Sequence, residues 1–214
     1  MSHDFRSPLA AIKASVTGLL QGDAPWDKST QRELLTGIDQ ETDRLNRMVS
    51  NILALSRLEA GAWRPQCEMT TISELLGAAL DTFNSEENKR IRVHIETTRE
   101  VSLDSVQIVQ VLHNLLENAL KYSEPDSLVE LCVAQREDTL QIEVSDRGYG
   151  IPFGEEERIF ERFYRASRWQ ESAQPGSGIG LAICRGLIEA HGGELTAKNR
   201  EGGGAFFSIA LPVL

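Results

Sequence analysis

The sequence has few of the features that mark metal-binding, secreted or membrane-spanning proteins. Its three cysteines, Cys67, Cys132 and Cys184, lie far apart and form no C-x-x-C pair, so metal-site and redox-motif interpretations are weak. We expect three buried, apolar cysteines in a reducing cytosol. No apolar run approaches the length of a membrane span, and there is no signal peptide. As given, the chain is expected to be soluble and cytoplasmic.

Positive charge is also scarce. Lysine and arginine number 22 against 32 aspartates and glutamates, for a net charge of −10. This balance argues against broad binding to nucleic acid or to anionic membranes, because both need a dense basic surface. Apolar residues make up 41% of the 214 residues, which is enough for a real core in one large domain or two small ones.

The first 60 residues predict two helices. The first runs from His3 to about Leu20 and is followed by a break at residues 22–27. The second runs from Lys28 to about Ala60 and repeats apolar residues at near-heptad spacing, as in a coiled coil: Leu35, Ile38, Leu45, Val49, Ile52 and Leu55. A homodimer that forms a four-helix bundle is the simplest way to bury this seam. The alternative is a hairpin that packs only on its own second domain.

After a connection at residues 61–71, helices and hairpins are mixed. Helices are expected over residues 72–83, 104–122 (with Asp104 as N-cap) and 179–191, and strands over residues 90–96, 128–134, 139–145, 194–198 and 205–211. This order predicts an α+β sandwich with helices on one sheet face. The expected domains are residues 1–62 and 71–214, with a linker at 63–70.

Three motifs in the second domain carry chemistry. Asn114 and Asn118 are four residues apart on one helix face, with Lys121 following, so two carboxamide oxygens and an ammonium group could hold Mg²⁺ and a triphosphate. Alone this motif is weak, because asparagines are common on exposed helices. Asp146, at a strand end before Gly148 and Gly150, could accept a hydrogen bond from an adenine amino group.

The third motif is a glycine-rich run, Pro175-Gly176-Ser177-Gly178-Ile179-Gly180-Leu181, that leads into a helix. A helix N-terminus preceded by glycines offers free N–H groups and a positive dipole end to phosphates. The ordered spacing of all three motifs indicates a nucleotide site more strongly than any one of them.

His3, in Ser2-His3-Asp4-Phe5-Arg6-Ser7-Pro8-Leu9, is a candidate phosphoryl acceptor because a carboxylate stands beside it. A lone histidine near a terminus would ordinarily be a solvated side chain. The other histidines, His94, His113 and His191, are interpreted as structural or surface groups.

These motifs resemble the conserved sequence boxes of sensor histidine kinases, which carry the GHKL (Bergerat) ATP-binding fold. Residues 3–9 resemble their phosphoacceptor box, residues 114–122 the N box, residues 146–150 the G1 box and residues 176–180 the G2 box. The F box corresponds to Ile159-Phe160-Glu161-Arg162-Phe163-Tyr164-Arg165. Within that family, residues 58–61 and 182–193 look most like Kdp-type potassium sensor kinases. The resemblance implies a two-helix dimerisation hairpin followed by the ATP-binding sandwich.

The resemblance also assigns roles. His3 would be phosphorylated with ATP and Mg²⁺, Asp4 would assist it, and a response-regulator receiver domain would accept the phosphate. Asn118 and Asn114 would be the metal ligands. The nucleotide-binding residues would be Asn114, Asn118, Lys121, Tyr122, Asp146, Gly148, Gly150, Ile151, Arg162, Tyr164, Arg165, Gly176, Gly178, Ile179, Gly180 and Leu181.

Departures from the family pattern shape further expectations. Gyrase, Hsp90 and MutL carry a water-activating glutamate where this chain has Asn114, and an amide is not a general base. Ser7 stands where the family usually has threonine or asparagine, whose side chain orients water when the kinase dephosphorylates its partner. The Ser7 hydroxyl keeps phosphatase activity open as a second activity. Residues 165–174 read as a mobile lid or an ordinary surface loop, with Arg168 and Trp169 as candidates to cover the nucleotide.

Only two residues precede His3, whereas the family's first helix begins well before the histidine. We therefore expect a core separated from its sensor, the cytoplasmic part of a longer, membrane-anchored kinase. The rival interpretations are a GHKL ATPase working as a conformational machine and an ATP-holding scaffold without catalysis.

Overall fold

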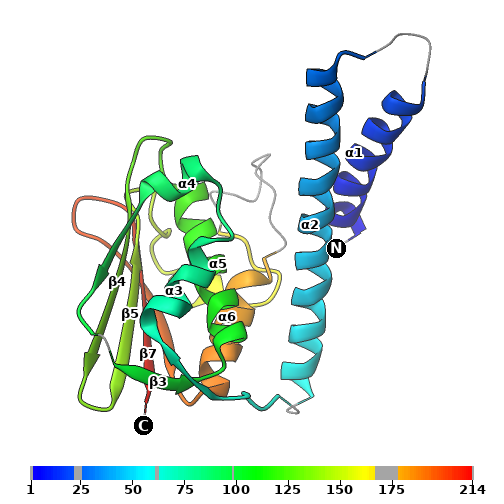
Figure 1. Ribbon diagram of the computed structural model, residues 1–214. Coiled ribbons are helices and arrows are strands. Elements are labelled where there is room, and N and C mark those ends of the chain that lie inside the picture. The colour runs from blue at the N-terminus through cyan, green and yellow to red at the C-terminus, as the bar shows by residue number, and fades with distance from the viewer. Residues whose placement is uncertain (1, 22–25, 61–62, 98, 167–177, 214) are drawn as a thin grey trace. The chain divides into compact units, whose positions relative to one another are not determined.

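The computed structural model describes residues 2–21, 26–60, 63–97, 99–166 and 178–213, without the side chains of residues 2–4 and 59. The chain forms two compact units, a helical hairpin that reaches Arg57 and a larger α/β unit that begins at Leu58 (Figure 1). Among the described residues, no helix is long and apolar enough to cross a membrane.

The hairpin consists of α1 (Ser2–Leu20) and α2 (Lys28–Glu59), which confirms both predicted helices. The Asp27 carboxylate accepts a 2.8 Å hydrogen bond from the Thr30 N–H and so caps the start of α2. The Trp26 indole N–H donates to the Gly18 carbonyl at 2.8 Å and ties the two helices together near the turn. Part of the predicted break, residues 22–25, lies outside the described residues.

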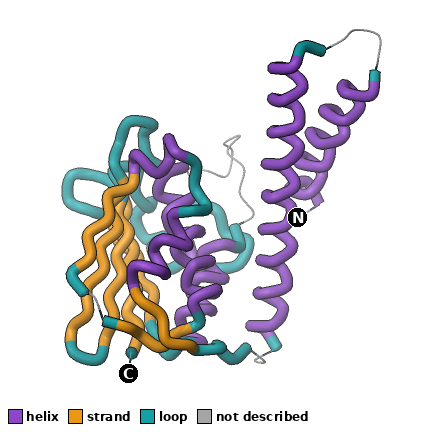
Figure 2. Tube along the Cα trace, viewed as in Figure 1, coloured by secondary structure: helices purple, strands orange, loops and turns teal. Residues whose placement is uncertain are grey.

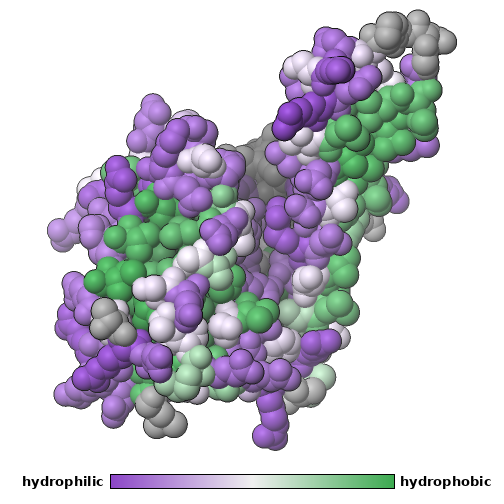
Figure 3. All heavy atoms as spheres, in the orientation of Figure 1, coloured by the Kyte–Doolittle hydropathy of each residue, from purple (hydrophilic) through white to green (hydrophobic). Residues whose placement is uncertain are grey.

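Apolar side chains remain uncovered along this hairpin. Leu35 and Val49 of the predicted seam are 58% and 48% exposed, and Leu9 and Leu20 of α1 are also exposed. Figure 3 shows apolar atoms gathered on this unit. The predicted seam is therefore present but only partly buried within one chain.

The larger unit is built on a five-stranded mixed sheet with the order β2-β4-β5-β7-β6. The strands are β2 (Ile91–Ile95), β4 (Val129–Arg136), β5 (Thr139–Ser145), β6 (Glu194–Asn199) and β7 (Ala205–Pro212), and only the β2–β4 pair is parallel. α3 (Ile72–Leu80), α5 (Ser105–Tyr122) and α6 (Gly180–Ala190) lie over one face of the sheet (Figures 1 and 2). The predicted helical hairpin and α+β sandwich are confirmed.

The core forms where alternate strand residues meet the helices. Leu131 and Val133 of β4 and Ile142 and Val144 of β5 point to the covered face and are at most 1% exposed. The apolar stripe of α5 packs with them and is equally buried: Ile108, Val111, Leu112, Leu115, Leu116 and Ala119. Apolar residues that alternate along the strands and recur about every 3.6 residues along the helix thus form one continuous core between the sheet and the helices.

Four short elements were not predicted. β1 (Glu68–Thr71) and β3 (Glu100–Leu103) form a separate two-stranded antiparallel sheet, and α4 (Ser85–Arg90) and the 3₁₀ turn η1 (Arg158–Phe160) fill connections. The connection expected at residues 61–71 therefore contains a strand, whose partner lies about 30 residues further along. The helix expected over residues 72–83 ends at Leu80.

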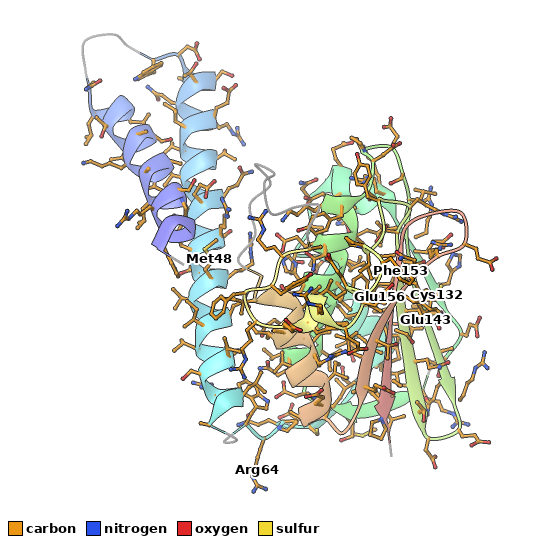
Figure 4. The ribbon with its side chains drawn as sticks, turned by 180° about the vertical axis from the view of Figure 1, so that it is seen from behind. Met48, Arg64, Cys132, Glu143, Phe153 and Glu156 are labelled. Carbon is orange, nitrogen blue, oxygen red and sulfur yellow. The ribbon has the colours of Figure 1, made fainter. Side chains whose placement is uncertain are left out.

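The expectation of three buried cysteines is wrong for two of them. Cys184 is fully buried, and burial raises its pKa to about 12. Cys132 is half-buried because it lies on the sheet face that the helices leave open, beside Glu143 on the neighbouring strand (Figure 4). Burial first, and then the charges of Glu143 and other nearby glutamates, raise the pKa of the Cys132 thiol. Cys67, next to the small sheet, is exposed.

His191 joins the end of α6 to the start of α5. Its Nδ1 lies 2.7 Å from the Leu187 carbonyl oxygen, which can only accept, so the proton belongs on Nδ1. Nε2 is then an acceptor and receives the Asp104 N–H at 3.3 Å. The Asp104 carboxylate in turn caps α5 by accepting from the Gln107 N–H, as predicted from sequence.

We therefore expect His191→Ala to lower the free energy of unfolding by about 1–2 kcal/mol, since two hydrogen bonds that hold a helix cap are lost. Urea unfolding of the purified protein measures the change. His94→Ala, an exposed position on β2, is the matched control and should change stability by less than about 0.5 kcal/mol. Equal effects of the two substitutions would contradict this role of His191.

Candidate nucleotide-binding site

The C-terminal half of α5 carries the first set of predicted site residues. Asn114 is 9% exposed, and its Nδ2 has no hydrogen-bond partner among the described residues. Asn118, one turn later, and Lys121 and Tyr122 at the helix end are half-buried. The Lys121 ammonium lies 4.8 Å from the centre of the Tyr122 ring. α5 thus presents one enclosed amide and three more accessible polar groups along its last two turns.

Asp146 follows directly after β5 and is 3% exposed. Its Oδ1 accepts two backbone hydrogen bonds, from the Gly148 N–H at 2.7 Å and the Ala205 N–H at 3.1 Å. No hydrogen bond from the described residues reaches Oδ2. One carboxylate oxygen is therefore fixed by the protein, whereas the other accepts no hydrogen bond from the described residues.

The pKa of Asp146 reflects two opposed influences. Burial raises it above the ordinary value, because a carboxylate loses hydration inside the protein. The two backbone N–H groups and the positive charge of Arg200 act in the opposite direction and offset part of that rise. The ionised form is thus costly for the folded protein, but it is held in a defined orientation.

The loop after Asp146 packs against the end of α5 so closely that only glycine fits. A Cβ on Gly148 would lie 2.1 Å from the Tyr122 carbonyl oxygen, and the Tyr149 N–H donates to that same oxygen at 3.4 Å. Gly150 has a φ of +70°, which glycine adopts readily. This contact brings the helix residues and the aspartate loop into one place.

The glycine run before α6 is described from Gly178 onward; Gly176 lies outside the described residues, as do Arg168 and Trp169. A Cβ on Gly180, the first residue of α6, would lie 3.8 Å from the Asn114 Oδ1. α6 therefore starts beside the enclosed amide of α5. Its N-cap, Ile179, provides no side-chain hydrogen bond to the first turn, and Leu181 within that turn is half-buried. No side chain among the described residues caps the start of this helix, so its first N–H groups are available for an anion.

The segment from η1 to Arg165 packs against Gly178. The Phe163 N–H donates to the Gly178 carbonyl at 2.9 Å, and a Cβ on Gly178 would lie 2.6 Å from the Tyr164 carbonyl oxygen. The guanidinium of Arg158 lies 4.5 Å from the centre of the Tyr164 ring. Burial and a hydrogen bond with Glu155 raise the pKa of the Tyr164 hydroxyl.

Arg162 is exposed and Arg165 half-buried. Phe153, just past the aspartate loop, is fully exposed (Figure 4).

No group of three or more histidine, cysteine, aspartate or glutamate side chains that could hold a metal occurs among the described residues. A metal here would need amide and phosphate oxygens.

These contacts bring together the three motifs that sequence predicted to form one nucleotide site. Residues 103–214 match the family of histidine kinase-, DNA gyrase B- and HSP90-like ATPases. The chain belongs to this ATPase family. Residues 1–61 match the His kinase A (phospho-acceptor) domain, so the chain pairs the two domains of a sensor histidine kinase core.

Relatives and solved structures agree with this assignment. The chain is 34% identical to the sensor protein KdpD of Clostridium acetobutylicum and 35% identical to that of Escherichia coli K12, over 99% of this chain and 24% of each relative. The sensor histidine kinase WalK of Bacillus subtilis is 32% identical over 99% of this chain and 35% of that protein. The chain therefore spans a quarter to about a third of the length of these relatives. The Kdp-type resemblance seen in the sequence is confirmed.

The fold matches that of the Acinetobacter baumannii histidine kinase AdeS, with a TM-score of 0.70, 21% identity, and 98% of this chain and 97% of that chain covered. The catalytic domain of the histidine kinase ThkA matches 69% of this chain and 95% of that chain, with 26% identity and a TM-score of 0.59.

The residues predicted to accept and assist the phosphoryl group lie in the hairpin unit. His3 and Asp4 belong to the first turn of α1, and their side chains lie outside the described part. Ser7 is exposed one turn after His3, and Pro8 lies inside the helix. Since proline has no N–H, the Asp4 carbonyl lacks its intrahelical partner.

Sequence reasoning missed Asn199 and Arg200, which reach the aspartate loop from the end of β6. Asn199 bonds to the backbone of Ile151, and Arg200 donates to the Ser145 hydroxyl at 3.0 Å and to the Asp146 carbonyl at 3.4 Å. The only signal was two polar residues at a strand end before a glycine-rich turn, which is equally typical of an ordinary hairpin.

Asp146→Asn should separate nucleotide binding from stability. The amide keeps an acceptor for Gly148 and Ala205 and removes the cost of a buried charge, so the free energy of unfolding at pH 7 should stay equal or rise. The amide N–H₂ would donate toward the adenine amino group that the carboxylate is predicted to accept from, so ATP affinity should fall at least about tenfold. Calorimetric ATP titration and urea unfolding measure the two effects.

For wild-type protein, the same argument predicts that ATP binding weakens as the pH falls through the raised pKa of Asp146 and the carboxylate takes up a proton. Asp126→Asn, at an exposed turn after α5, is the control and should leave affinity unchanged. Undiminished ATP affinity in Asp146→Asn would exclude this carboxylate from adenine recognition.

Gly148→Ala should lower stability by about 1–3 kcal/mol, because the new methyl group overlaps the Tyr122 carbonyl. Gly77→Ala offers a matched comparison, since a Cβ at this position in α3 meets nothing within 4 Å. It should raise stability by about 0.5–1 kcal/mol through helix propensity. Thermal and urea unfolding would detect both changes, and a neutral Gly148→Ala would refute the close packing.

Proposed function

We propose that this chain transfers the γ-phosphoryl group of ATP to His3 and then to an aspartate on a response-regulator receiver domain. The observation that carries the proposal is the convergence of the α5 end, the Asp146 loop and the start of α6. Gly148 touches Tyr122, and Gly180 lies beside Asn114. These groups could hold adenine at one end and phosphates at the other.

In this scheme the Asp146 carboxylate accepts from the adenine amino group through Oδ2. The first-turn N–H groups of α6 face the phosphates, and Lys121 neutralises phosphate charge. The predicted contacts of Arg162, Tyr164, Arg165 and Gly176 with the nucleotide remain part of the proposal.

Asn118 and Asn114 were both predicted as Mg²⁺ ligands, and the donor set fits this ion, which prefers oxygen and keeps several waters. Asn118 is the better candidate because it is more accessible, whereas the Asn114 amide is almost enclosed beside Gly180. When bound, Mg²⁺ would neutralise charge on the transferring phosphates.

The His3 imidazole would attack the γ-phosphorus through the nitrogen farther from the backbone, and the bond to the β-phosphate oxygen would break to release ADP. Asp4 would hold or accept the proton on the other nitrogen, which makes the imidazole a better nucleophile. The receiver aspartate would then displace the imidazole and take the phosphoryl group.

Two rival functions are less favoured. A hydrolytic ATPase needs a base to activate water, and Asn114 is an amide in a buried position. A scaffold that only holds ATP would not need the His3 box.

Ser7 retains a hydroxyl that is exposed one turn after His3, which supports phosphatase activity toward the phosphorylated receiver domain.

We further propose a homodimer in which two hairpins form a four-helix bundle. The exposure of Leu9, Leu35 and Val49 supports it, since a second copy would cover them. With a relative such as KdpD about four times as long, we place this chain in the cytoplasmic part of a longer, membrane-anchored sensor kinase.

Incubation with γ-labelled ATP and Mg²⁺ tests the proposal. Wild-type protein should acquire acid-labile, base-stable label, and His3→Gln should acquire none because the acceptor nitrogen is gone. His94→Gln, on an exposed strand position, should label like wild type. Label that persists in His3→Gln would move the acceptor elsewhere, whereas ATP turnover that persists without labelling would favour the hydrolytic rival.

A further inference from the structure

The side chain of Asn199 pairs with both backbone groups of one residue in the aspartate loop. The Ile151 N–H donates to the Asn199 Oδ1 at 2.7 Å, and the Asn199 Nδ2 donates to the Ile151 carbonyl at 2.8 Å. Two short hydrogen bonds from one carboxamide fix the position and the direction of that peptide segment, as a neighbouring strand would. The two residues are 48 positions apart, so the pairing depends on the tertiary fold.

The same hairpin also holds the beginning of the loop. The Asp146 N–H donates to the Ala205 carbonyl at 3.0 Å, and the Ala205 N–H donates to the Asp146 Oδ1 at 3.1 Å. The six-residue segment 146–151 is therefore anchored at its first residue by β7 and at its last residue by the end of β6.

Gly150 makes the second anchor possible. A Cβ at this position would lie 2.5 Å from the Asn199 Oδ1, and the φ of +70° suits glycine. A segment with two glycines, Gly148 and Gly150, has many conformations unless contacts hold it along its length. The Tyr149 N–H holds its middle on the Tyr122 carbonyl, and Asn199 holds its last residue, Ile151.

We propose that Asn199 is a positioning residue for the nucleotide site, which fixes the path of residues 146–151 and so aims the free oxygen of Asp146 at adenine. The inference rests on the proposed ATP-binding function and deepens it. Asn199 itself is exposed, so its removal should disturb ligand recognition more than the fold.

The test compares ATP with purine riboside triphosphate, which lacks only the 6-amino group that Asp146 would recognise. Asn199→Ala should weaken ATP binding about five- to tenfold, the effect of one poorly made hydrogen bond. The analogue should lose less affinity, so the preference for ATP should fall at least about threefold. Asn199→Asp should behave similarly, because its second oxygen faces the Ile151 carbonyl and cannot donate.

Thr196→Ala, an exposed position on the same strand, is the matched control and should retain the wild-type preference and melting temperature. In an Asp146→Asn background, Asn199→Ala should change the preference no further, since the group through which it acts is gone.

Three results would overturn the inference. The first is an unchanged preference of Asn199→Ala for ATP over purine riboside triphosphate. If the affinities for both nucleotides fall equally and the melting temperature is lowered, the role of Asn199 is purely structural. The second is a wild-type protein that binds both nucleotides equally, because Asp146 would then not read the amino group. The third is a wild-type protein that binds neither, which would remove the proposed function together with this inference.

Discussion

The candidate site depends on the register between β5 and β7. Ser145 pairs with Phe206 at the end of that ladder, so the next residues, Asp146 and Ala205, meet through two hydrogen bonds. A shift of one residue would turn the buried face of β5 outward and move the carboxylate away from the Ala205 N–H. The core residues Ile142 and Val144 therefore specify the position of Asp146 as firmly as its own contacts do.

Close backbone contacts impose a second constraint on the same loop. The glycines in and around this loop are required by contacts within the protein itself. Gly148 fits against Tyr122, and Gly204, with a φ of +98°, fits against the Asp146 carbonyl, where a Cβ would lie 2.1 Å away. The glycines first allow α5, the loop and the hairpin to meet, and a nucleotide would use the surface that this meeting creates.

These contacts explain which parts of the molecule could be predicted. The Asp104 cap, the helix that it begins and the strands β6 and β7 follow from local patterns, and the structure confirms them. β1 was missed because four residues contain too little periodicity, and their pairing with β3 is set by the tertiary fold. Asn199 was missed for a related reason, because its partner lies 48 residues away and an asparagine at a strand end is ordinary.

The division into two units has a consequence for the proposed reaction. His3 belongs to the hairpin, whereas Asn118, Asp146 and Gly180 belong to the α/β unit, so the proposed phosphoryl acceptor and these three proposed nucleotide-site residues lie in different units. ATP affinity should then be a property of the α/β unit, set by local contacts such as those of Asp146. The transfer rate depends in addition on how often the acceptor reaches the phosphate, which is an effective concentration set by the connection between the units. Changes in that connection can therefore alter the rate of transfer without altering the affinity for ATP, which is how a signal could act on such a core.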